Sequence, residues 1–158
     1  MSPQASAEPT GPAQTELPQL TGLELLRTAL SQGSHAPYIG DLLGMELELL
    51  EYGKVVFALQ TRPDFANPLG TTHGGICATL LDSAMGCAVH TTMDAGVGCA
   101  TLELKINYIR PVPTDGRRLT ATGTTIHVGR TTATAEGRVV DDQGRLVAHA
   151  TTTCVIFR

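Results

Sequence analysis

The amino-acid sequence predicts an α+β fold in which a curved antiparallel sheet of about six strands wraps around one long apolar helix. The helix is indicated by residues 76–89, an apolar run of helical length with few polar side chains. Residues 45–50 before it and 100–109 after it alternate polar with apolar residues, and one more segment before it and three more after it are strand candidates joined by turns. Such alternation is typical of strands that bury one face, and the helix is the natural cover for that face.

The chain before the hairpin divides into a tail and a short helix. Residues 1–19 are rich in Pro, Ala, Ser and Thr and hold almost no large apolar side chains, so we expect a disordered tail. Residues 20–158 are expected to form a single domain, which suits a chain of 158 residues. The domain begins with a capping box at Thr21 and Glu24, followed by leucines at helical spacing as far as Gly33.

The predicted strands form one hairpin and a group of four. Residues 45–50 and 54–59 flank a turn at 51–53, and the turn-rich stretch 61–72 then leads into the helix. The later strands are expected at 100–109, 118–128, 131–140 and 146–157. In the first of these, four large apolar residues should share one face: Leu102, Leu104, Ile106 and Tyr108.

Composition argues against several classes of function. A net charge of −4 disfavours general binding of nucleic acid or acidic membranes, and no apolar run is long enough to cross a bilayer. The four cysteines lack metal-ligand spacing, so no metal site is expected, and free thiols favour the cytoplasm. Only 16% of the residues are charged, so we expect other copies of the chain to cover part of the surface.

One carboxylate interrupts the apolar helix. Asp82 is accompanied there by only two other polar side chains, Thr79 and Ser83. Burying an unpaired carboxylate is costly, so a chain that does so usually has a use for it. Asp82 is therefore a candidate nucleophile or general base. The alternative is a core carboxylate that is satisfied by a neighbouring hydroxyl group.

The same helix opens with His73, Gly74 and Gly75. Free amides and a partial positive charge at a helix start attract an anionic oxygen, although paired glycines also serve tight packing. Asp82 lies about 10–12 Å further along the axis, so one carbonyl group cannot contact both places. If the two act together, they come from two chains whose helices pair antiparallel across a two-fold axis. This arrangement predicts two equivalent composite sites per dimer.

The segment Asn67-Pro68-Leu69-Gly70-Thr71-Thr72-His73-Gly74-Gly75, followed by Asp82, resembles the signature of the PaaI-like (phenylacetate-degradation) group of hot-dog-fold acyl-CoA thioesterases. It is also similar to the related Arthrobacter-type 4-hydroxybenzoyl-CoA thioesterases, and the resemblance covers roughly residues 40–157. It implies the hot-dog fold, hydrolysis of an acyl-CoA thioester, and a homo-oligomer that is a dimer or a dimer of dimers. Coenzyme A would be part of the substrate, with no separate cofactor and no metal.

The resemblance also implies roles for individual residues. Asp82 takes the position of the catalytic carboxylate, and the Gly74 N–H would polarise the thioester carbonyl. Asn67 would hold the attacking water or the substrate, and Thr101 stands where relatives carry Ser or Thr near that water. Hydroxybenzoyl-specific relatives have Glu at the Asp82 position, so Asp favours the PaaI-like branch. His73 is a further candidate base, although a residue just before a helix more often bonds to nearby backbone.

Basic residues gather in one part of an otherwise acidic chain: Arg110, Arg117, Arg118 and Arg130. Arg110 ends a predicted strand, and Gly129, Arg130 and Thr131 form a turn whose amides are candidates for binding an anion. The phosphates of coenzyme A suit such groups, and the resemblance points most to Arg130 and Thr131. The alternative is ordinary solvated charge on loops.

Two other functions stay open. An enoyl-CoA hydratase of the same fold would need a His and an acidic residue at one site, and His73 falls too far downstream of Asp64 to match that pattern. A non-catalytic acyl-CoA-binding protein would keep the arginines and have no use for Asp82. The acyl group is open between aryl and medium-chain types, with a pocket expected from Ile76, Leu80, Met85, Gly86 and Met93.

Overall fold

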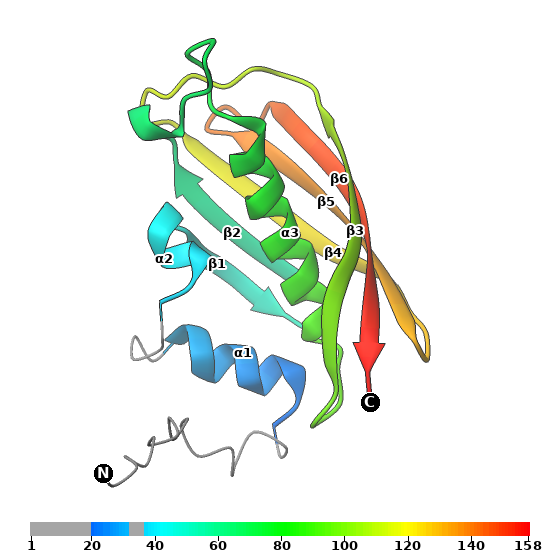
Figure 1. Cartoon of the computed structure of the whole chain (residues 1–158). Helices are drawn as coiled ribbons and strands as arrows, with labels where there is room; N and C mark the ends of the chain where they lie inside the picture. The colour runs from blue at the N-terminus through cyan, green and yellow to red at the C-terminus, as the bar shows by residue number, and fades with distance from the viewer. Residues whose placement is uncertain (1–19, 32–36) are drawn as a thin grey trace, which may run out of the picture.

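The computed structural model describes residues 20–31 and 37–158 (Figure 1). The tail expected at residues 1–19 and the helix end expected at Gly33 lie outside these ranges. The described helices and strands share a hydrophobic core that lies between the long helix and the sheet.

The sheet has the strand order β1-β2-β4-β5-β6-β3, and every neighbouring pair is antiparallel. Its strands are β1 (Glu46–Glu51), β2 (Lys54–Gln60), β3 (Gly98–Tyr108), β4 (Arg118–Val128), β5 (Thr132–Asp141) and β6 (Leu146–Phe157). The sheet curves around helix α3 (Gly74–His90), which confirms the predicted architecture (Figure 1). The predicted bounds of β4 and β6 are confirmed as well.

Helix α3 packs closely into the concave face of the sheet. Two glycines allow this approach, because a Cβ at Gly123 of β4 would clash with the backbone of Ala84, and a Cβ at Gly137 of β5 would lie 2.9 Å from the side chain of Met85. The buried face of the helix repeats at helical spacing and carries Leu80, Leu81, Ala84, Met85 and Ala88. The opposite face is only partly covered, and Asp82 lies on that side.

Helix α1 (Gly22–Ser31) is fixed to the C-terminal end of α3. Its predicted capping box is confirmed by the bonds that Thr21 and Glu24 exchange through their side chains and backbone amides. The Gly22 N–H donates to the carbonyl of Met93 at 2.9 Å, and a Cβ at Gly22 would clash with the carbonyl of His90. The five-residue helix α2 (Ile39–Leu43) lies in a stretch for which the sequence predicts no helix or strand, and a 3₁₀ turn, Pro63–Phe65, precedes α3.

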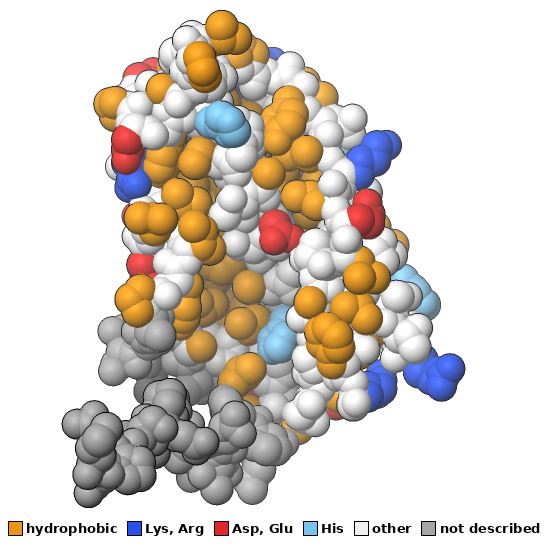
Figure 2. Space-filling view, in the orientation of Figure 1, with side chains coloured by type: hydrophobic (Ala, Val, Ile, Leu, Met, Phe, Trp, Pro, Cys, Tyr) orange, Lys and Arg blue, Asp and Glu red, His pale blue; other side chains and the backbone are white. Residues whose placement is uncertain are grey.

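Strand β3 is the last strand at one edge of the sheet, and it carries a β-bulge. Its register against β6 shifts between Thr101 and Glu103, which leaves Leu102 as the extra residue. The predicted alternation is therefore wrong at Leu102, which is 60% exposed while Leu104 and Ile106 pack against the core. A bulge resets the alternation of side chains, so Thr101 and Leu104 line the same hollow. Figure 2 shows hydrophobic side chains spread over this open face.

Candidate active site

Asp82 and Thr101 meet on the open face of α3. The Thr101 hydroxyl donates to Oδ1 of Asp82 at 2.8 Å, so the carboxylate has the hydroxyl partner that the sequence left open. The sequence also predicts a buried Asp82, whereas in the single chain it is half-buried. A hydrogen-bonded, reachable carboxylate suits a base or nucleophile better than a sealed one does.

Two hollows lie on either side of Asp82. One has a volume of about 230 Å³ and is lined by Ala78, Thr79 and Leu104 together with Asp82 and Thr101. The other has a volume of about 400 Å³ and extends toward α1 and the end of α3. The carboxylate therefore lies in the wall that the two hollows share.

The expected acyl pocket is only partly where the sequence placed it. Gly86 lines the larger hollow beside Asp82. Leu80, Met85 and Met93 do not, because they are buried in the core. The reason is the helical repeat: positions 80, 81, 84, 85 and 88 share the face that packs on the sheet, whereas 82, 83, 86, 87 and 90 share the open one.

The start of α3 separates the roles of its three residues. The Gly75 N–H donates to Nδ1 of His73 at 2.9 Å, so the imidazole caps the helix. This bond to nearby backbone is the alternative to a role for His73 as a base. Within residues 20–31 and 37–158, no acceptor takes the Gly74 N–H. That amide is therefore available to an anionic oxygen at the positive end of a 17-residue helix.

Tyr108 is part of this region, and the sequence did not single it out for the site. Its hydroxyl donates to the Gly74 carbonyl at 3.0 Å. A Cβ at Gly74 would lie 2.9 Å from the tyrosine ring, so glycine is required by the packing as well as by the proposed ligand. The only signal in the sequence was its place as the last large residue of β3, at the level of the helix start. Tyr108, Gly74, Asn67 and Arg110 line a hollow of about 370 Å³.

The Asn67 side chain organises its own loop. Its Oδ1 accepts the N–H groups of Leu69 at 2.9 Å and Thr71 at 3.1 Å, and its Nδ2 donates to the Thr71 hydroxyl at 3.0 Å. An amide nitrogen carries two hydrogens, so one donor is left for a ligand in the adjoining hollow.

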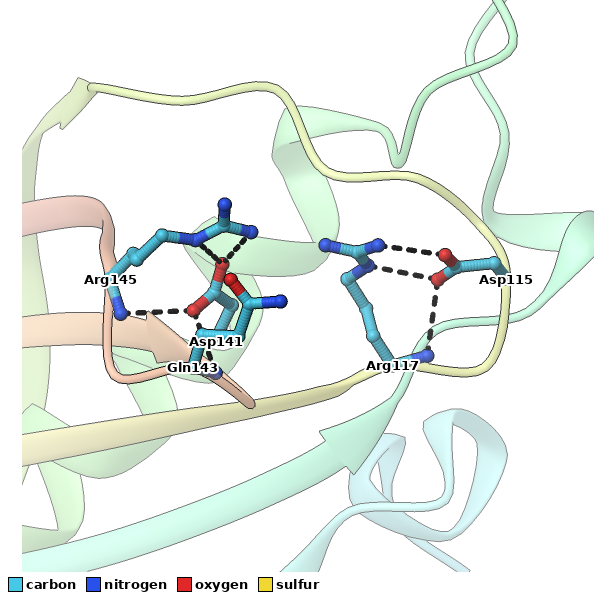
Figure 3. A network of polar contacts seen from close by, with 5 residues as sticks. All are labelled: Asp115, Arg117, Asp141, Gln143 and Arg145. Atoms are coloured by element: carbon cyan, nitrogen blue, oxygen red, sulfur yellow. Dashed lines mark hydrogen bonds and ion pairs between the residues drawn. The ribbon is translucent and has the colours of Figure 1, made fainter.

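Two of the four clustered arginines are held by carboxylates. Arg117 pairs with Asp115 at 2.7 Å, and Arg118 pairs with both Glu46 and Glu48. Figure 3 shows the Asp115–Arg117 pair beside a second group, in which the carboxylate of Asp141 accepts from Gln143 and Arg145.

These arginine contacts hold two carboxyl groups in the charged form. Hydrogen bonds from Arg117 lower the pKa of Asp115 to about 2, and hydrogen bonds from Arg145 lower the pKa of Asp141 to about 2. These pairs fix the turns at one end of the sheet. Together with the pairing of Arg118 to Glu46 and Glu48, they explain Arg117 and Arg118 as structural residues.

Arg110 and Arg130 form no ion pair within the described residues, and they lie at opposite ends of the sheet. Arg110 follows β3 just after Tyr108, which pairs with Ala148, whereas the turn of Arg130 is at the level of Val155. In that turn the Gly129 N–H donates to the Thr132 carbonyl at 2.8 Å, so this amide is not free for an anion.

One chain thus assembles the predicted residues in three separate places. Asn67, His73, Gly74 and Arg110 surround the helix start, Asp82 and Thr101 meet two turns later, and Gly129, Arg130 and Thr131 lie at the far end. Within the described ranges, no three His, Cys, Asp or Glu residues are grouped to hold a metal ion. None of the described helices has the length and hydropathy needed to span a membrane.

The sequence profile of the Thioesterase superfamily matches residues 69–148. The chain is 28% identical over 137 residues to the medium/long-chain acyl-CoA thioesterase YigI of Escherichia coli K12, covering 77% of this chain and 86% of the relative. It is 24% identical over 116 residues to the 1,4-dihydroxy-2-naphthoyl-CoA hydrolase of Listeria monocytogenes, covering 73% of this chain and 93% of the relative.

Solved structures share the fold. The E. coli PaaI protein from the phenylacetic acid degradation operon superposes with a TM-score of 0.75 at 22% identity, covering 88% of this chain and 96% of that one. Streptococcus mutans smu.793, solved bound to acetyl CoA, gives a TM-score of 0.66 at 29% identity, covering 72% and 88%. The architecture is the hot-dog fold of the PaaI-like thioesterases. The chain belongs to the thioesterase superfamily, and its relatives support thioester hydrolysis as its general chemistry.

Proposed function

We propose that the chain hydrolyses an acyl-CoA thioester to a free carboxylic acid and coenzyme A, using Asp82 of one copy and the Gly74 N–H of a second. The observation that carries this proposal is the state of these two groups. Asp82 is half-buried, oriented by Thr101 and open to hollows on both sides, while the Gly74 amide is free at the start of the same helix. They lie about 12 Å apart along one axis, so one thioester cannot reach both within a single chain.

A two-fold pairing of α3 helices resolves this separation. An antiparallel pair brings the Gly74 end of each helix to Asp82 of the other, which yields two equivalent sites. The same operation brings Arg110 of one copy to the side of the partner's far end, where Arg130 and Thr131 lie. Both could then contact the phosphates of one coenzyme A.

The edge strand supports a second copy as the cover. Tyr108 and Ile109 remain 53% and 52% exposed at the end of β3, and Leu102 is exposed at the bulge. Edge strands and contiguous apolar surface are usually covered by another chain. A dimer is thus proposed as the smallest active unit, and a dimer of dimers as its assembly.

The chemistry follows from these groups. The Gly74 N–H donates to the carbonyl oxygen of the thioester and stabilises the negative charge that develops there. Asp82 either removes a proton from water that attacks the carbonyl carbon, or attacks that carbon itself and is released from the anhydride by water. In both routes the C–S bond breaks, coenzyme A leaves as the thiolate and then takes up a proton, and water supplies the oxygen of the acid. Thr101 holds the carboxylate in position.

Coenzyme A enters this scheme as substrate, in line with the acetyl CoA bound by the Streptococcus mutans structure. The relatives named for medium/long-chain and dihydroxynaphthoyl thioesters leave both acyl classes open. Enoyl-CoA hydration has less support, because Nδ1 of His73 already accepts the Gly75 N–H. A cytoplasmic location remains a prediction, and the four free cysteines fit a reducing compartment.

The test is the Asp82→Asn variant, which keeps the shape of the side chain and removes its charge. Release of free thiol from a panel of acyl-CoA thioesters should fall by about 10²–10⁴-fold, the contribution of a positioned base. The matched control is Asp94→Asn, the same change at an exposed residue of the turn after α3, which should keep full activity. Unchanged turnover in the Asp82 variant would refute the assignment. Acyl-CoA binding by the wild-type protein without thiol release would indicate a non-catalytic binding protein instead.

A further inference from the structure

The larger hollow beside Asp82 is a surface groove that runs along α3. Helix α3 contributes Asp82, Gly86 and His90, which recur every four residues and so lie in one line. Leu26 of α1 covers this line from one side, and Cys99 of β3 and Cys154 of β6 cover it from the other. We call this hollow the α1 channel. Its length from Asp82 to His90 is about 12 Å, the rise of eight helical residues.

The walls of the α1 channel are uncharged beyond its mouth. Burial raises the pKa of the Cys87 thiol, which also lines the hollow, to about 12, and raises that of Cys99 to about 11. Burial lowers the pKa of His90, so the imidazole at the far end is neutral near pH 7. Its Nδ1 lies 3.7 Å from the sulfur of Cys99. Neutral thiols and leucines form an apolar lining.

We propose that the α1 channel binds the acyl chain of the substrate, and that this chain is a straight aliphatic group of about eight to ten carbons. The proposal rests on the function proposed above, because it places the thioester carbonyl beside Asp82. An extended chain advances about 1.2 Å per bond, so 12 Å holds about ten bonds. The cavity volume of about 400 Å³ is ample for such a chain.

Gly86 is the residue that sets the usable length. A Cβ at this position would meet only the Thr101 hydroxyl, at 4.0 Å, so a side chain has room to project into the channel without disturbing the core. The position is one turn beyond Asp82, about 6 Å along the axis, which corresponds to about five bonds of an extended chain. A leucine here should therefore block long chains and leave short ones unaffected. Replacing glycine inside a helix also favours helix formation.

The experiment compares Gly86→Leu and Gly86→Ala with the wild-type protein. The value of kcat/KM is measured by thiol release for straight-chain acyl-CoA thioesters from acetyl to palmitoyl and for phenylacetyl-CoA and benzoyl-CoA. Wild type should prefer the octanoyl to decanoyl range. Gly86→Leu should lose at least about tenfold on those substrates and change little on butyryl-CoA, with Gly86→Ala between the two. Thr28→Leu, which adds the same side chain at an exposed position of α1, is the control and should leave the profile unchanged.

A binding measurement separates this proposal from the proposed function. Alkyl thioethers of coenzyme A cannot be hydrolysed, so calorimetric titration with the octyl and butyl thioethers reports on the channel alone. Tighter binding of the octyl compound, lost in Gly86→Leu, supports the channel even if no substrate is hydrolysed. Chain-length preferences that are identical in wild type and Gly86→Leu would overturn the proposal. A preference for the aryl substrates that survives in Gly86→Leu would overturn it as well.

Discussion

The start and the middle of α3 differ in how firmly their polar groups are held. At the start, the side chains of His73, Asn67 and Tyr108 are each held by a hydrogen bond to the chain's own backbone or to a neighbouring loop residue. Two turns later, Asp82 accepts a hydrogen bond from Thr101 and has hollows on both sides. A fixed amide suits charge stabilisation, which depends on donors that do not have to move. An open carboxylate suits a step in which substrate and water must enter.

Among changes at the start of α3, Gly74→Ala should reduce activity the most. The added methyl group would lie 2.9 Å from the Tyr108 ring, so the helix start must shift. The N–H of residue 74 would then no longer point at the thioester carbonyl. Thiol release should fall by about 10²–10³-fold, the usual cost of losing one oxyanion donor. Near-normal activity would mean that the amide is not used.

The same variant shows whether Gly74 of one copy acts together with Asp82 of another. Co-expressed Gly74→Ala and Asp82→Asn subunits that pair at random form heterodimers about half the time, and each heterodimer has one intact composite site. Activity should recover to about a quarter of the wild-type value. A site contained within one chain would show no recovery at all.

Thr101→Ala, which acts on Asp82 in the middle of α3, should reduce activity less. It removes the 2.8 Å hydrogen bond to Asp82 without altering the carboxylate itself. A hydrogen bond to a charged group contributes about 1.5–3 kcal/mol, so the expected loss in kcat is about 10–100-fold. Thr101→Ser keeps the hydroxyl and should stay within about threefold of wild type. Equal losses in both variants would mean that the methyl group, and not the hydroxyl, is what matters.

Acid between pH 4 and pH 2 should loosen the loop before α3 earlier than it loosens the middle of the helix. Asp115 and Asp141 have folded pKa values of about 2 against an ordinary 3.8, so the stability they add is present above about pH 4 and is lost as pH falls toward 2. Asp115 anchors the loop whose Val112 carbonyl accepts the Thr72 N–H at 2.7 Å, next to His73. Amide hydrogen exchange between pH 4 and pH 2 should therefore rise at residues 67–72 earlier than in the middle of α3. Asp115→Asn should remove much of that difference.

Much of this molecule could be predicted from sequence because it depends on local pattern. The helix, its glycine start, the capping box at Thr21 and the strand limits follow from spacing and turn chemistry. The contact between Asp82 and Thr101 could not be derived that way. Strict alternation along β3 groups Leu102 with Leu104 and turns Thr101 away from the helix, and only the bulge at Leu102 reverses this. The resemblance to the PaaI-like group, and not the strand pattern, suggested Thr101.

Contacts between distant segments account for the other differences. Leu80 and Met85 were expected in the acyl pocket because they are large and apolar, but the helical repeat places them against the sheet. Tyr108 was counted as one more strand residue, since its contact with Gly74 joins segments 34 residues apart. The sequence around Arg117 and Arg118 does not distinguish an arginine held in an ion pair from one free to bind a ligand. Helix α2 has only five residues, too few for a periodic signal.

The attachment of α1 has an evolutionary consequence. Gly22 fits against the His90 carbonyl so tightly that the start of this helix has a fixed position, and the rest of α1 places Leu25 and Leu26 beside the hollow that Asp82 lines. Helix α1 would thus line part of the acyl site without supplying any of the groups that cleave the thioester. During evolution, replacement of the leucines on this one short helix could therefore change the preferred acyl chain while the catalytic residues stayed the same.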